Sequence, residues 1–254
     1  MKPYAERIIM KLPTPVLASV VVVLSLGMFG CSSNSSALSE QTGSTAQVQD
    51  LSSFEAVEEA VVNDVDLTTD ALISEYEQLA SEITTYEGFL DNTERIDSFY
   101  EDVVKETSKL CIVLEGRCAT YAEIALSSGD SKGAIYDDLE GMYDAIYEDA
   151  FEDIYDDIYE GVLKEMYDTF YDGILKDAYD SASYGQWSDA RSDEYSRWSD
   201  ARSDVYRAWS DARSDIYRFW SSLRSDVYGN KIERAQKELE DFQEDIEKAM
   251  TSED

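Results

Sequence analysis

The chain has 254 residues and a formal net charge of −34 at pH 7, because 55 acidic residues stand against only 21 basic ones. A surface of this charge opposes binding of nucleic acids and anionic lipids and favours cationic partners and divalent counterions. The sequence contains no histidine, so histidine-based catalysis and histidine metal sites are excluded as well.

Residues 1–30 have the composition of a secretion signal. Three basic residues precede an apolar stretch at 16–26, which is shorter than the roughly 20 apolar residues of a transmembrane helix. The junction Gly30-Cys31, followed by serines, resembles the lipobox of bacterial lipoproteins. That resemblance implies cleavage before Cys31 and acylation of Cys31 with chains such as palmitate, which would anchor the protein to the extracytoplasmic side of a cell membrane. The alternative is an ordinary secretory signal in which Cys31 plays no part.

Residues 31–50 are rich in Ser, Thr, Gln and Ala and show no apolar periodicity, so we expect a flexible tether. From Cys31 onward, 54 acidic residues stand against 18 basic ones, a difference of −36. Proline is absent after residue 15, and long uninterrupted helices are therefore expected in the remainder.

Residues 51–128 carry apolar residues alternately three and four positions apart, which is typical of helices that pack in pairs. Ser52 and Glu55 have the spacing of a capping box and predict a short first helix. A second helix is expected at 68–90, and a third after an interruption at 91–93. We interpret the long helices as an antiparallel hairpin.

Cys111 and Cys118 fall on the third of these helices. Seven residues of helix span about 10.5 Å, whereas a disulfide requires Cα atoms within about 7 Å. An intrahelical disulfide is therefore excluded unless Gly116 breaks the helix. We interpret both cysteines as small buried apolar residues, and an intermolecular or break-dependent disulfide is the alternative.

Residues 131–181 change to a strict period of four, with tyrosines or other apolar residues recurring from Leu139 to Tyr179. On a straight α-helix four residues advance by about 400°, so such a stripe would spiral around the helix. Either neighbouring helices wrap around it, or the glycines of this segment bend or break it so that each piece realigns, and we favour the second alternative. These glycines are Gly141, Gly161 and Gly173.

The same segment is strongly acidic, since residues 134–180 hold sixteen acids against Lys164 and Lys176. Divalent cations such as Ca²⁺ are conceivable partners, but no loop with alternating ligands and a turn glycine resembles an EF-hand. We interpret the acids as a solvated face and expect no resident metal or cofactor.

Residues 184–228 contain four tandem eleven-residue units, and all four tryptophans of the chain lie in them. The units read YGQWSDARSDE, YSRWSDARSDV, YRAWSDARSDI and YRFWSSLRSDV. Eleven residues over three turns average about 3.67 per turn, so each position keeps to one face of a long α-helix. Each arginine follows a tryptophan by one turn and lies between the tryptophan and tyrosine columns, which suits cation–π stacking. The residues of this rail are Trp187, Trp198, Trp209, Trp220, Arg191, Arg202, Arg213 and Arg224.

Three interpretations of the rail compete. In the first, which we favour, it packs against the tyrosine stripe of 131–181 and its arginines meet the acidic neighbour. In the second, an exposed rail binds a partner protein, peptide or cell-wall glycan, because aromatic residues and arginine are enriched at binding hot spots. In the third, the helix lies on a membrane, since eleven-residue repeats resemble those of lipid-surface proteins such as apolipoproteins and synucleins. The abundant aspartates and missing lysines argue against that interpretation.

Residues 229–254 return to a heptad pattern after the Gly229-Asn230 phase change, and this helix either closes back on the hairpin or pairs with another subunit. The expected fold is all-α, an elongated helical hairpin or coiled-coil-like bundle. The pattern as a whole resembles uncharacterised helical lipoproteins of gut-type bacteria, which implies no activity. We expect a membrane-anchored structural or protein-interaction component of the cell envelope, with an envelope protein or a second copy as partner, and no enzymatic activity.

Overall fold

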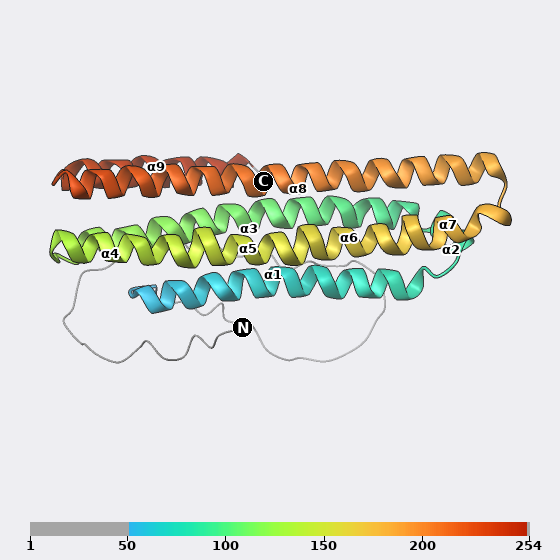
Figure 1. Cartoon of the computed structure of the whole chain (residues 1–254), viewed down its shortest axis with the longest axis horizontal. Helices are drawn as coiled ribbons and strands as arrows, with labels where there is room; N and C mark the ends of the chain where they lie inside the picture. The colour runs from blue at the N-terminus through green and yellow to red at the C-terminus, as the bar shows by residue number, and fades with distance from the viewer. Residues whose placement is uncertain (1–50, 253–254) are drawn as a thin grey trace, which may run out of the picture. The chain divides into compact units, whose positions relative to one another are not determined.

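Every secondary-structure element of residues 51–252, the part of the chain that the computed structural model describes, is a helix. Long helices lie side by side and pack into a bundle (Figure 1), so the predicted all-α class is confirmed. No helix in this range is long and apolar enough to cross a membrane. The expected signal segment, the lipidation site Cys31 and the tether lie outside the described residues.

Helix α1 (Phe54–Glu82) is continuous, and the predicted division of this region into two helices at 62–68 is wrong. The row of apolar residues continues across this region without a break, because Val61, Val65 and Leu72 are all buried in the core. The N-cap is also one residue later than expected, since the Ser53 hydroxyl accepts the Ala56 N–H at 3.2 Å.

The break between the hairpin arms comes earlier than expected. Helix α1 ends at Glu82, and Thr85 starts the short helix α2 (Tyr86–Asp91) by accepting the Gly88 N–H at 3.1 Å. Helix α3 (Thr93–Ser127) then runs back along α1 and ends at the expected position. Gly129 follows with a φ of 69°, a left-handed conformation that glycine adopts without strain.

Gly116 does not interrupt α3. Cys111 and Cys118 therefore lie on one continuous helix, where both side chains are buried and no disulfide joins them, as the interpretation of small apolar residues expects. Burial raises the pKa of the Cys118 thiol, which keeps it protonated.

The period-four segment forms one helical stretch from Lys132 to Asp180, here called the tyrosine helix. Its glycines do not break it, contrary to the favoured expectation. Wider π-helical segments, with backbone hydrogen bonds from residue i+5 to residue i, recur every twelve residues between short α-helical ones. In order they are α4 (Lys132–Met142), η1 (Tyr143–Ala150), α5 (Phe151–Ile154), η2 (Tyr155–Val162), α6 (Leu163–Met166), η3 (Tyr167–Ile174), α7 (Leu175–Asp177) and the 3₁₀ turn η4 (Ala178–Asp180).

Mixing the two helix types removes the spiral of the stripe. Twelve residues over three turns average four per turn, which is the period of the sequence, whereas a pure α-helix has about 3.6. The buried positions accordingly repeat every twelve residues with no drift. They include Leu139, Phe151, Leu163 and Leu175 in one column, and Met142, Ile154, Met166 and Ala178 in another.

Helix α8 (Tyr184–Tyr228) contains the whole eleven-residue repeat without a break, and it runs antiparallel to the tyrosine helix (Figure 1). A turn containing Asn230, whose φ is 59°, leads into α9 (Ile232–Ser252). Helix α9 folds back onto α3 and α8, where Phe242 stacks on Phe219 with ring centroids 4.1 Å apart. Of the two arrangements expected for this helix, the chain adopts the intramolecular one.

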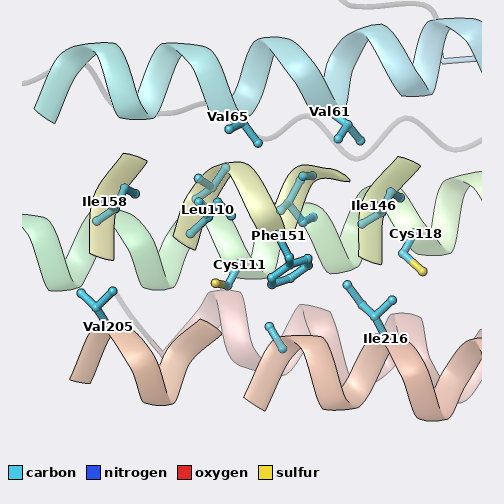
Figure 2. Packing of buried hydrophobic residues seen from close by; sticks show 14 of the residues in the cluster. Val61, Val65, Leu110, Cys111, Cys118, Ile146, Phe151, Ile158, Val205 and Ile216 are labelled. Carbon is cyan, nitrogen blue, oxygen red and sulfur yellow. The ribbon is translucent and has the colours of Figure 1, made fainter. Parts of the chain in front are cut away.

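The core is aliphatic along most of its length. Figure 2 shows side chains of α1, α3, the tyrosine helix and α8 converging between the helices. Burial of this continuous apolar surface provides the main driving force for folding. The labelled residues are Val61, Val65, Leu110, Cys111, Cys118, Ile146, Phe151, Ile158, Val205 and Ile216.

Glu194 interrupts this apolar interior. It ends the first repeat unit, where the other units have Val205, Ile216 and Val227, and its side chain is fully buried. The Tyr100 hydroxyl of α3 donates to its Oε1 at 2.7 Å. Burial raises the pKa of Glu194 to about 7, and burial together with nearby Asp215 raises that of Glu115 to about 8.

These two carboxyls predict that the bundle loses stability as the pH rises. Both pKa values lie above the ordinary 4.5, so the folded state holds the protons more tightly than the unfolded state between roughly pH 4.5 and 8. The free energy of unfolding should therefore fall across that window. Glu194→Gln should raise it by about 2 kcal/mol at about pH 8 and change it little at about pH 5.

Urea unfolding at the two pH values measures this effect. Glu240→Gln, an exposed substitution on α9 with the same change in charge, is the control. A Glu194→Gln protein with the pH dependence of the control would contradict the assignment.

Candidate functional site

All four tryptophans of the rail reach the backbone of the tyrosine helix. The indole Nε1–H of Trp198 donates to the carbonyl oxygen of Leu163 at 3.1 Å, and that of Trp209 donates to Phe151 at 2.8 Å. Trp220 and Trp187 donate in the same way to Leu139 and Leu175. The donors thus recur every eleven residues and the acceptors every twelve.

Three of the four accepting carbonyls lie where an α-helical segment passes into a π segment, and the fourth, that of Leu175, lies in α7 before the 3₁₀ turn η4. The Tyr155 N–H, at the start of η2, is shared between the carbonyls of Phe151 and Glu152. The Tyr167 N–H is shared in the same way between Leu163 and Lys164. The Tyr143 N–H is shared between Leu139 and Glu140. Three of the four tryptophans therefore donate to a carbonyl whose helical hydrogen bond is weakened by sharing, and each of these carbonyls gains a second partner.

The two repeats match in length because of the π segments. Eleven residues of α8 rise by about 16.5 Å, and twelve residues of the tyrosine helix must cover the same distance to keep the contacts in register. The π turns contain more residues per turn than α-helical turns, and they therefore accommodate the additional residue over the same number of turns. Gly161 and Gly173 sit in these turns, where a Cβ would lie 3.1 Å from the carbonyl oxygens of Asp156 and Asp168, five residues earlier.

Between successive hydrogen bonds, aromatic rings of both helices form clusters. Tyr155 and Tyr159 stack with centroids 4.9 Å apart, and Tyr155 packs against Trp209 at 5.4 Å. Tyr206 completes the cluster, 5.8 Å from Tyr159 and 5.6 Å from Trp209. The same arrangement recurs in Tyr143, Tyr147, Tyr217 and Trp220, and in Tyr167, Tyr171, Tyr195 and Trp198.

The arginines of the rail join one cluster to the next. The Arg202 guanidinium lies 4.3 Å from the ring centroid of Tyr159 and 5.2 Å from that of Trp198, and it forms an ion pair with Glu160 at 3.2 Å. Cation–π contact and the carboxylate together offset the cost of partly burying the charge. Arg191, Arg213 and Arg224 bridge Trp187 to Tyr171, Trp209 to Tyr147 and Trp220 to Tyr136.

This seam of tyrosines, tryptophans and arginines lies at the edge of the core. Trp220 is 8 % exposed, and Trp187, Trp198 and Trp209 are half-buried. The rail therefore packs against the tyrosine helix, as the favoured interpretation expects, but it forms a surface seam beside an aliphatic core. The eleven-residue period predicts the rail but not its acceptors. The signal for the acceptors is a twelve-residue repeat in the tyrosine helix, with the units YDAIYEDAFEDI, YDDIYEGVLKEM and YDTFYDGILKDA.

Two other features of the bundle have the residue types of a ligand site. Acids of α1 and the tyrosine helix crowd together, where burial and neighbouring Asp156, Asp66 and Asp70 raise the pKa of Asp157. No group of three or more metal-ligating side chains within residues 51–252 has the geometry to hold an ion. An open hollow of about 430 Å³ beside α2 is lined by Tyr86, Thr169 and neighbouring residues. Neither feature has the regularity of the seam.

No family model, curated protein or solved structure matches the chain. The seam is the feature that combines regular spacing, polar contacts and exposed surface, and we take it as the candidate functional site.

Arg213 allows the cation–π contribution to the seam to be measured. Arg213→Met keeps the aliphatic stem but removes the charge between Tyr147 and Trp209, and should lower the free energy of unfolding by about 1 kcal/mol. Arg207→Met is the matched control, because Arg207 lies on the same helix, 68 % exposed and paired only with nearby Asp204. Equal losses in the two variants, measured by urea unfolding, would show that the seam arginine contributes only its charge.

Proposed function

We propose that the protein is a lipid-anchored, extracytoplasmic component of a bacterial cell envelope, with a non-enzymatic structural or protein-interaction role. The anchor rests on the resemblance of Gly30-Cys31 to a lipobox. Two or more acyl chains would give stable attachment, because each buried methylene contributes about 0.8 kcal/mol.

The observation that carries the structural role is the internal use of the rail. All four indole N–H groups donate to the tyrosine helix, and all four rail guanidinium groups lie over its rings. Those groups are therefore engaged in holding two long helices in register. A rigid body of long helices suits a spacer or a scaffold on which partners assemble.

The second candidate function is a binding module for glycan or peptide. It is favoured by the outer tyrosines of the seam, since Tyr195 and Tyr206 are both 48 % exposed. The indole donors are less suited to this role, because a ligand would have to displace their backbone acceptors.

The anchor predicts a specific role for Cys31. Cys31→Ser should move the protein from the membrane fraction to the soluble extracytoplasmic fraction and abolish labelling by an alkyne analogue of palmitate. Cys118→Ser should leave both unchanged, because that thiol is buried in the bundle. A Cys31→Ser protein that is still labelled and still in the membrane fraction would contradict the proposed anchor.

A further inference from the structure

From the second repeat unit to the fourth, the seam presents one exposed tyrosine per unit. Tyr195 and Tyr206 are each 48 % exposed, and Tyr217 is 46 % exposed. One side of each ring packs in its cluster, 5.8 Å from Tyr171, Tyr159 or Tyr147 respectively. Eleven residues of helix separate successive rings by about 16.5 Å. We call Tyr195, Tyr206 and Tyr217 the outer tyrosines.

Acidic side chains accompany these rings along the tyrosine helix. Each tyrosine of a stacked pair is followed directly by an exposed acid, in the order Asp144, Glu148, Asp156, Glu160, Asp168 and Asp172. Glu160 and Asp172 pair with rail arginines, and Asp168 pairs with Lys164. Asp144, Glu148 and Asp156 form no ion pair within the described part of the chain.

The nearest exposed cations on α8 are already neutralised. Arg207 lies 2.9 Å from Asp204, and Arg218 pairs with Asp215. Because three of the six acids beside the stacked tyrosines form no ion pair within the described residues, the surface along the seam carries an excess of negative charge. Such a surface favours a cationic occupant, and it opposes a second copy of this chain.

Within the seam, the protein's own arginines already bind to tyrosine rings of the kind that the surface exposes. Rail guanidinium groups lie 4.2 to 4.3 Å from the ring centroids of tyrosines in the tyrosine helix, and three of the four also pair with a carboxylate of that helix. An external guanidinium would find a tyrosine face and a carboxylate in a similar combination. Arginine suits this geometry better than lysine, because its planar group stacks on rings and is weakly hydrated.

We propose that the outer tyrosines and the neighbouring acids form a docking surface for an extended, arginine-rich segment of a partner protein. This inference rests on the proposed interaction role and specifies its partner. The regular spacing lets one extended chain contact several units at once. Because these contacts belong to one chain, individually weak contacts combine into a higher overall affinity.

Fluorescence anisotropy with a labelled arginine nonamer tests the proposal on the purified full chain in detergent. The arginine nonamer should bind at least about three times more tightly than a lysine nonamer, and its affinity should fall with added salt. Tyr195→Leu/Tyr206→Leu/Tyr217→Leu should weaken binding of the arginine nonamer about ten-fold without changing the net charge.

A pair of charge-matched variants separates docking from general attraction. Asp144→Asn/Glu148→Gln/Asp156→Asn should weaken binding about ten-fold, and it does not alter the rings. Glu240→Gln/Asp241→Asn/Glu247→Gln makes the same charge change on exposed positions of α9 and should weaken binding less than two-fold. Circular dichroism melting of each variant establishes that the bundle is folded.

Equal weakening by the two charge variants, or equal binding of the two nonamers, would overturn the proposal in favour of non-specific attraction. Binding of cellohexaose at the outer tyrosines with no binding of the arginine nonamer, or self-association alone, would also overturn it. None of these outcomes bears on the membrane anchor, which the Cys31→Ser fractionation tests separately.

Discussion

The structure depends on keeping an eleven-residue repeat and a twelve-residue repeat in register along two antiparallel helices. Each indole hydrogen bond fixes one point of that register, and the π turns take up the additional residue between points. In a pure α-helix, the carbonyls opposite successive tryptophans would be eleven residues apart, whereas the repeat of the tyrosine helix is twelve residues long. Each tryptophan would then face a different position of that repeat. The rings and guanidinium groups that fill the intervals could then not repeat.

The rest of the bundle follows from this constraint. Because the stripe of the tyrosine helix does not spiral, one face can pack against α3 at α4, α1 from η1 to η2 and α2 at η3, while another meets α8 from α4 to η4. The cost is a set of weakened backbone hydrogen bonds at the transitions, and the indole donors offset part of it. Glu194 fixes a second register, since its bond to Tyr100 aligns α8 with α3 at one place only.

Much of this architecture could be predicted from residue patterns, and the failures have physical causes. The eleven-residue period was sufficient to predict an unbroken α8 and the stacking of each arginine on its tryptophan, because 3.67 residues per turn is close to α-helical geometry. The period of four was interpreted with α-helical rotation, which led to the wrong expectation of a helix broken at Gly161 and Gly173. Glycine in those positions relieves a close approach to the carbonyl five residues earlier. The end of α1 and the capping role of Ser53 depend on local competition between neighbouring serines and threonines, which spacing alone does not resolve.

Indole hydrogen exchange is the most direct test of the register. The chain has four tryptophans, so an NMR spectrum should show four indole N–H resonances that can be followed separately. We expect the indole N–H groups of Trp198, Trp209 and Trp220 to exchange far more slowly than that of free indole. The indole N–H of Trp187, in the first turn of α8, should exchange fastest of the four because helix ends open most readily. Exchange of all four at the rate of free indole in a folded protein would contradict this register.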